Sequence, residues 1–113
     1  MTVKFTILGC GSSLGVPRID GYYGKCDPLN KKNHRTRCSA LITTKNMNFL
    51  FDTSSDIKTQ LLTNKVININ RVFYTHSHAD QTHGINELRA FWFKNKKKIP
   101  IHADKNTTNY LKK

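Results

Sequence analysis

Three histidines and an aspartate gather within a short segment of the sequence. His76, His78 and Asp80 stand at alternate positions, directly after an apolar and aromatic run at 71–74. Side chains two residues apart on an extended backbone leave the same face, so both imidazoles and the carboxylate can reach one metal ion. Imidazole together with carboxylate suits zinc, iron or manganese. The pattern therefore predicts a metal site in this segment.

The stretch from Thr75 to Asp80, continued by 83–89, resembles the signature of metallo-β-lactamase-fold hydrolases. It is most similar to the branch that includes the phosphoribosyl cyclic phosphodiesterases. Segment 8–18 resembles the glycine-rich opening of this branch, 26–39 resembles its insert, and 51–54 resembles the end of its second strand. The resemblance implies an α+β fold, a metallo-β-lactamase-like αββα sandwich. This chain would form the first half, with about five to six strands and two to three helices.

The resemblance also implies roles for the residues of the segment. His76 and His78 would hold the first of two metal ions, zinc or manganese, and Asp80 would bind the second ion and orient the nucleophile. The family pattern is HxHxDH, and Gln81 stands where the last histidine belongs. A glutamine amide is neutral and binds zinc weakly, so we expect one ion or none in this chain. His83 is an alternative ligand, but its spacing differs from that of the family.

Asp52 follows the apolar run 48–51 and is a further candidate. Read from the sequence alone, it caps a turn, because Asp, Thr and Ser are good capping residues. The resemblance places it beneath the metal site, where it would orient the ligands. Both roles are compatible.

The length of the chain limits how much of this site it can build. With 113 residues it forms one domain at most, and we interpret 1–113 as a single partial domain, the amino-terminal portion of the family fold. His102 is the only histidine after His83, and Asp104 is the only acid after Glu87. The ligand set is therefore not completed from within. We expect a fragment, a split gene product or a decayed one, with a second chain supplying the missing half or with pairing as a homodimer.

The formal charge is +12, from 19 basic and 7 acidic residues. Such a charge suits a polyanion, but the basic clusters at 31–37 and 94–98 are not interleaved with aromatic side chains. Solvated surface together with a biased base composition is the favoured interpretation. A basic mouth that attracts phosphate esters is the alternative.

The cysteines number three, which is odd, and no signal peptide or apolar run of membrane-spanning length is present. We expect a reduced, cytoplasmic protein that does not enter a membrane. Cys26, His34 and Cys38 can supply three ligands to a structural zinc ion. Otherwise Cys38 is a small buried residue at the start of the next strand.

Alternating and β-branched runs predict strands at 3–8, 39–44, 48–51, 71–74 and 99–103, with the second and third forming a hairpin. Glycines at 9, 11 and 15 predict a tight loop, and 17–37 is a long polar stretch. Helices are predicted at 55–64, from 84 onward, and at 106–111 after Asp104. The apolar residues of the first two helices should face the core: Ile57, Leu61, Leu62, Ile85, Leu88, Phe91 and Trp92.

Together these features favour a metal-dependent hydrolase of the phosphodiester type, including cyclic phosphates, that is incomplete or inactive as an isolated chain. Its substrate would be a small phosphodiester or an RNA end. A pair of metal ions would clamp the attacking and leaving oxygens of the ester. The alternatives are a non-catalytic remnant, a small basic nucleic-acid-binding protein, and a structural-zinc module. Whether the chain is an enzyme stays open at this point.

Overall fold

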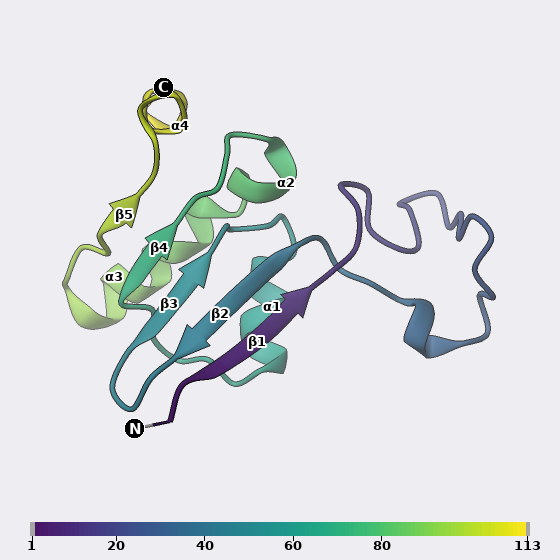
Figure 1. Cartoon of the computed structure of the whole chain (residues 1–113), viewed down its shortest axis with the longest axis horizontal. Coiled ribbons are helices and arrows are strands. Elements are labelled where there is room, and N and C mark those ends of the chain that lie inside the picture. Colours follow the sequence, from purple (N-terminus) through teal and green to yellow (C-terminus); the bar gives the residue numbers. More distant parts are fainter. Residues whose placement is uncertain (1, 113) are drawn as a thin grey trace.

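A computed structural model describes residues 2–112 as a single mixed sheet with helices on one side and a last helix beyond the end of the final strand (Figure 1). The strands lie in chain order: β1 (Lys4–Gly9), β2 (Ser39–Thr43), β3 (Asn48–Phe51), β4 (Arg71–Phe73) and β5 (Ile101–His102). The first three strands are antiparallel, whereas β3, β4 and β5 run parallel. The predicted strands and the predicted hairpin are confirmed. The parallel pairing carries β3 and β4 to the same edge of the sheet, where both strands end.

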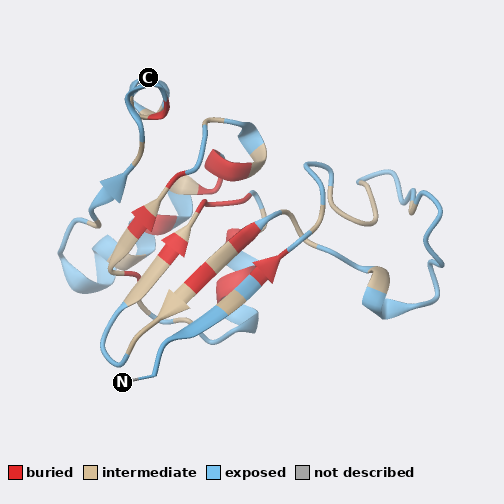
Figure 2. Cartoon of the chain, in the orientation of Figure 1, coloured by how far each residue is buried: buried red, intermediate tan, exposed pale blue. Residues whose placement is uncertain are grey.

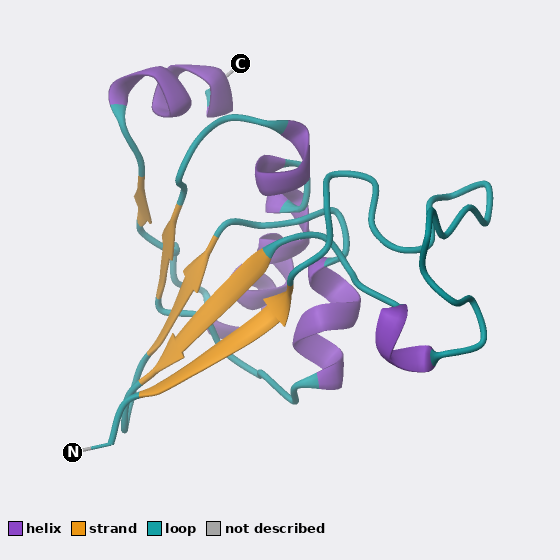
Figure 3. Ribbon diagram, turned by 45° about the vertical axis from the view of Figure 1, so that its right-hand side comes forward, coloured by secondary structure: helices purple, strands orange, loops and turns teal. Residues whose placement is uncertain are grey.

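The helices are α1 (Ile57–Thr63), α2 (Ala79–Thr82), α3 (Arg89–Asn95) and α4 (Lys105–Leu111), with 3₁₀ turns η1 (Lys31–Asn33) and η2 (Ile85–Leu88). Figure 3 shows α1 and α3 on the same side of the sheet. Asp104 begins α4 as predicted, because its Oδ1 accepts a hydrogen bond from the backbone N–H of Thr107 at 2.8 Å. Among residues 2–112, no helix has the length and apolar character needed to cross a bilayer.

The core lies between the sheet and these helices. Leu41, Leu50 and Val72 stand opposite one another on neighbouring strands, and all three are buried. Ile57 and Leu61 of α1 complete this cluster, together with Leu88 and other apolar side chains. The alternation of each strand therefore sends one set of side chains toward the helices.

Three expectations about burial are wrong. Leu62 is 69% exposed and Trp92 is 44% exposed, because each follows a core residue and turns about a quarter of a circle away from it on a helix. Cys38 is exposed as well. It precedes β2, at the point where the chain returns from the long polar stretch to the sheet.

The opposite face of the sheet is apolar but uncovered by any helix in the described part of the chain (Figure 2). Phe5 and Ile7 of β1 are 62% and 65% exposed. The ring of Phe73 stacks on Phe51 with the centroids 5.2 Å apart and on His102 at 4.8 Å. We call these residues and their neighbours Ile42 and Phe49 the open face.

Residues 10–38 form an arm that projects from the sheet and contains only η1 and two isolated bridges (Figure 1). The bridges join Gly11 to Arg37 and Val16 to Arg35. Gly9 and Gly11 allow this close approach, because a Cβ on Gly9 would lie 2.2 Å from the carbonyl oxygen of Arg37. The tight glycine loop and the long irregular stretch are thus as predicted.

The phenol of Tyr74 gives a first prediction. Burial raises its pKa to about 12 from 10.0, while the hydrogen bond with Thr53 Oγ1 at 2.8 Å opposes the shift. Since the unfolded chain loses this proton first, stability should fall as the pH rises from about 10 to 12, by about 2–3 kcal/mol in all. Urea unfolding across this range should show the decline. In Tyr74→Phe the decline should be shallower, although its stability at neutral pH is lower by about 1 kcal/mol for the lost hydrogen bond.

Gly84 gives a second prediction. A Cβ on this residue would lie 2.0 Å from the backbone oxygen of Ser54 and 2.8 Å from Ile57 Cγ2. Gly84→Ala should therefore push the segment after the histidines away from α1 and lower the free energy of unfolding by roughly 2–4 kcal/mol. Gly24→Ala is the control, because nothing lies within 4 Å of the added Cβ and only its positive φ opposes it. That control should lose about 1 kcal/mol. Equal losses in the two variants would contradict this account.

Candidate metal centre

The histidine segment begins where β4 ends. Tyr74 is buried, and its N–H donates to the carbonyl of His102 at 2.9 Å, which fixes the end of the strand. Thr75 stands at a bend, and His78, the residue before α2, has an extended backbone with φ and ψ of −63° and 151°. The rings of His76 and His78 lie 4.6 Å apart, centroid to centroid, at an interplanar angle of 78°. The two imidazoles are thus neighbours, as their spacing predicts, and their role as metal ligands stays a prediction.

Asp80 does not continue the extended row. The helix α2 begins at Ala79, so Asp80 stands in its first turn, where the backbone is already helical. Its Oδ2 accepts a hydrogen bond from Gln81 Nε2 at 2.8 Å. The carboxylate therefore leaves the backbone from a helical turn and not from an extended row, and one of its oxygens accepts a hydrogen bond from its neighbour.

Asp52 joins the end of β3 to the histidine segment. Its side chain is buried, and its backbone adopts a left-handed φ of 64°. Its Oδ1 accepts from the N–H of Thr75 at 2.8 Å, and its Oδ2 accepts from Thr75 Oγ1 at 2.9 Å. Thr75 Oγ1 in turn lies 2.8 Å from His76 Nδ1. Asp52 thus reaches His76 only through Thr75, a residue that the sequence interpretation did not single out, and its orienting role stays a prediction.

The charge environment of Asp52 links it to the same cluster. Burial raises the pKa of this carboxyl, and its two hydrogen bonds from Thr75 work in the opposite direction. Smaller contributions come from His76, which lowers the pKa, and from Asp80, which raises it. The carboxylate of Asp52 therefore accepts its hydrogen bonds from Thr75 and does not cap the turn that leads into α1.

Gln81 is buried and holds an unsatisfied acceptor. Its Nε2 must be the atom that faces Asp80, because an ionised carboxylate only accepts hydrogen bonds. Its Oε1 then has no partner among the described residues. An unpaired buried acceptor costs about 1–3 kcal/mol.

These donors fit part of a metal coordination shell. Two adjacent imidazoles are donors of the right chemical type for zinc or manganese. Within residues 2–112, however, no three His, Cys, Asp or Glu side chains converge as a complete metal-holding group. An ion bound between His76 and His78 would take its remaining ligands from water or from another polypeptide segment.

The other histidines have partners elsewhere. His83 Nε2 lies 3.3 Å from Tyr110 Oη, and His102 Nε2 lies 3.0 Å from the guanidinium of Arg71. Neither has a described contact with His76 or His78.

The proposed structural-zinc residues are not gathered in the described part of the chain. His34 Nε2 is hydrogen bonded to Tyr23 Oη at 3.0 Å, and Cys26 and Cys38 are free and exposed. The irregular arm holds these three residues without a common centre. A zinc ion there stays a prediction that the geometry does not support.

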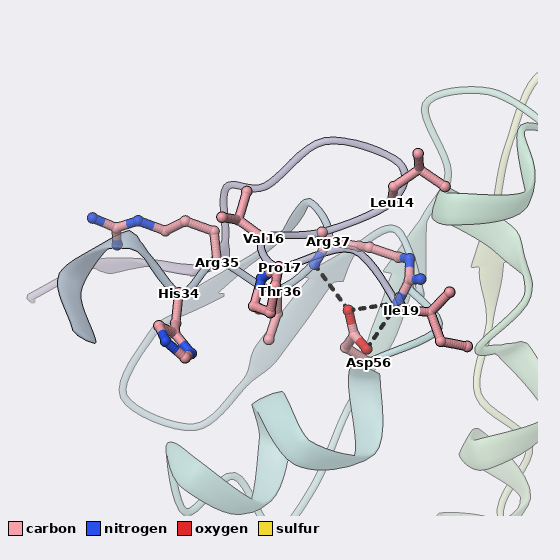
Figure 4. A pocket seen from close by; sticks show the side chains of 10 residues that line it. Leu14, Val16, Pro17, Ile19, His34, Arg35, Thr36, Arg37 and Asp56 are labelled. Carbon is pink, nitrogen blue, oxygen red and sulfur yellow. Dashed lines mark hydrogen bonds and ion pairs between the residues drawn. The ribbon is translucent and has the colours of Figure 1, made fainter. Parts of the chain in front are cut away.

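An open pocket of about 400 Å³ lies at the base of the arm (Figure 4). The apolar side chains of Leu14, Val16 and Ile19 line it, and an ion pair between Arg37 and Asp56 at 3.1 Å closes one side. It shares no residue with the histidine segment. The ion pair ties the arm to the start of α1, and this is the role that we assign to it.

Comparison with known proteins identifies the family. A family model described as "Beta-lactamase superfamily domain" matches residues 47–113. A solved diphosphatase of the PhnP family is 30% identical, with a TM-score of 0.86 over 99% of this chain and 45% of that chain. The Zn(2+)-bound PqqB of Methylobacterium extorquens is 19% identical, with a TM-score of 0.76 over 98% of this chain and 40% of that one. Human tRNase Z, short form, is 20% identical, with a TM-score of 0.71 over 97% and 38%.

A curated protein of Porphyromonas gingivalis named octanoyltransferase is 29% identical over 97% of this chain, but the match covers only 22% of that protein. The chain thus spans less than half the length of each of these relatives. The family model covers more than half of the chain, including every residue of the histidine segment and Asp52. The chain therefore belongs to the beta-lactamase superfamily and forms an amino-terminal portion of the metallo-β-lactamase fold.

Proposed function

We propose that this chain is the histidine-bearing part of a metal-dependent hydrolase that acts on phosphodiesters. The observation that carries the proposal is the pair of adjacent imidazoles, His76 and His78. The first of them is hydrogen bonded to Thr75, which the buried Asp52 holds in turn. The fold neighbours named as a diphosphatase and a tRNase Z support a phosphoric ester as the substrate. We propose a small phosphodiester or an RNA end, and zinc or manganese as the ion.

Each residue then has a distinct role. His76 and His78 hold the ion as neutral ligands, so that its positive charge is not cancelled. Asp80 would use the oxygen not held by Gln81 to orient the attacking water and accept its proton. When bound, the metal supplies Lewis acidity and lowers the pKa of water. Gln81 holds Asp80 in place of binding a second ion, so we expect one ion and weak activity.

Metal binding by the 113-residue chain tests the first part of this proposal. Zinc and manganese titrations followed by calorimetry should give a single weak site. His76→Ala and His78→Ala should each weaken it about tenfold or more, because each removes one of few protein ligands. His83→Ala and His102→Ala are the matched controls, since these rings have other partners, and should bind as the parent does. Equal binding by all four variants would contradict the proposed site.

We also propose that a further polypeptide segment completes the site by packing on the open face. This face presents exposed Phe5 and Ile7 beside the stacked ring of Phe73, with the cation Arg71 next to them on β4. An apolar sheet face of this kind normally packs on another layer. The partner should therefore bring a second apolar sheet, a carboxylate opposite Arg71, and the missing metal ligands.

Co-expression of this chain with a candidate partner tests whether a second polypeptide completes the site. The partner would be the part of the solved PhnP-family diphosphatase that this chain does not cover. We expect co-purification and hydrolysis of a nitrophenyl phosphodiester in manganese or zinc, increased by Gln81→His. Phe73→Asp should abolish association, because it places a charge in the apolar interface. Leu62→Asp is the control, on an exposed residue of the opposite side.

Three results would redirect the proposal. Association without hydrolysis, even with Gln81→His, would favour a non-catalytic remnant. A homodimer of the chain alone, seen by sedimentation and lost in Phe73→Asp, would make a second copy the occupant of the open face. Binding to RNA that is steeply salt-dependent and unaffected by chelators would favour a basic nucleic-acid-binding protein.

A further inference from the structure

The carboxylate of Asp52, the hydroxyl of Thr75 and the ring of His76 form a line of hydrogen bonds from the buried sheet edge to the exposed imidazole. Thr75 is held twice by Asp52, through its backbone N–H at 2.8 Å and through Oγ1 at 2.9 Å. The same Oγ1 lies 2.8 Å from His76 Nδ1. Because the backbone and the side chain of Thr75 are both fixed, the hydroxyl cannot turn away without losing a bond to a buried charge.

A count of hydrogens gives the direction of each bond. A hydroxyl has one hydrogen to donate and lone pairs with which to accept. An ionised carboxylate only accepts, so the hydrogen of Thr75 Oγ1 is directed to Asp52 Oδ2. The oxygen then has only lone pairs to offer to His76. The imidazole nitrogen 2.8 Å away must therefore carry the hydrogen of that bond.

We propose that Thr75 is a positioning residue that fixes His76 as the tautomer protonated on Nδ1, so that Nε2 is the nitrogen presented to a metal ion. In water a neutral imidazole exchanges between its two tautomers, and only the one with a free Nε2 can bind through that atom. The hydrogen bonds from Asp52 through Thr75 to His76, which we call the relay, exclude the competing tautomer before any ion binds. This inference rests on the proposed function for the identity of the ligand, but the tautomer is a property of the metal-free chain.

The alternative is that every hydrogen bond between Asp52, Thr75 and His76 runs in the opposite direction, which predicts the other tautomer of His76. Were Asp52 protonated on Oδ2, it would donate to Thr75 Oγ1, and Thr75 would donate to Nδ1. His76 would then be protonated on Nε2 and closed to a metal at that atom. The backbone N–H of Thr75 donates to Oδ1 whatever the direction of the hydroxyl bond, and it favours the ionised carboxylate because it stabilises negative charge, whereas burial works in the opposite direction.

Nitrogen NMR of the histidine rings in the metal-free chain at neutral pH tests the relay directly. We expect His76 to be protonated on Nδ1 in the parent chain. Thr75→Ser keeps the hydroxyl and should keep this tautomer. Thr75→Val keeps the shape but removes the hydroxyl, so His76 should shift toward the Nε2-protonated form. Thr44→Val, at the turn at the far end of β3, is the control and should leave His76 unchanged.

Zinc affinity provides the second readout. Thr75→Val should weaken zinc binding about tenfold or more, whereas Thr75→Ser and Thr44→Val should bind as the parent does. An Nε2-protonated His76 in the parent chain, or an unchanged tautomer in folded Thr75→Val, would overturn the relay. If His76 has the expected tautomer but the parent binds no zinc, the relay stands and the proposed function fails.

Discussion

The buried carboxylate of Asp52 is the interaction on which the site depends. Strands β3 and β4 run parallel and end together, so the residues that follow them meet at one edge of the sheet. Asp52 follows β3 and accepts both bonds from Thr75, which lies one residue beyond Tyr74 at the end of β4. The left-handed backbone of Asp52 costs about 1 kcal/mol and turns its side chain toward the neighbouring strand end. Without this carboxylate, the amide and hydroxyl of Thr75 would lack their acceptors.

The sequence was informative wherever local pattern decides structure. Alternation located the strands, and the Asp104 cap located the last helix. The spacing of His76 and His78 predicted neighbouring rings, and their centroids lie 4.6 Å apart. Asp80 shows where that argument stops. A helix begins at Ala79, and the period-two rule no longer applies after this point.

Features that depend on long-range contacts were not accessible from pattern. Thr75 resembles any polar residue after a strand, and its role emerges only when Asp52, distant in the sequence, lies beside it. The close approach of Gly84 to Ser54 is of the same kind. The prediction that Trp92 is buried was wrong for a different reason. Trp92 follows a residue of the core-facing stripe and was counted with it, whereas its side chain lies partly in solvent beside Lys96.

The backbone of Gln81 helps to fix the conformation of the histidine segment, whereas its side chain is the part that a metal ion would contact. Its carbonyl accepts from the N–H of Thr53 at 2.8 Å, and the carbonyl of Thr53 accepts from the N–H of Gly84 at 3.0 Å. These bonds tie the histidine segment to the strand end after β3, and they involve only backbone atoms of residue 81. A ligand can therefore be exchanged at this position without loss of the loop. The glutamine side chain lowers stability locally, because its buried Oε1 has no hydrogen-bond partner among the described residues, but the backbone bonds are unaffected. The chain can thus retain the backbone of the histidine segment even though one of the ligands expected for the family is absent.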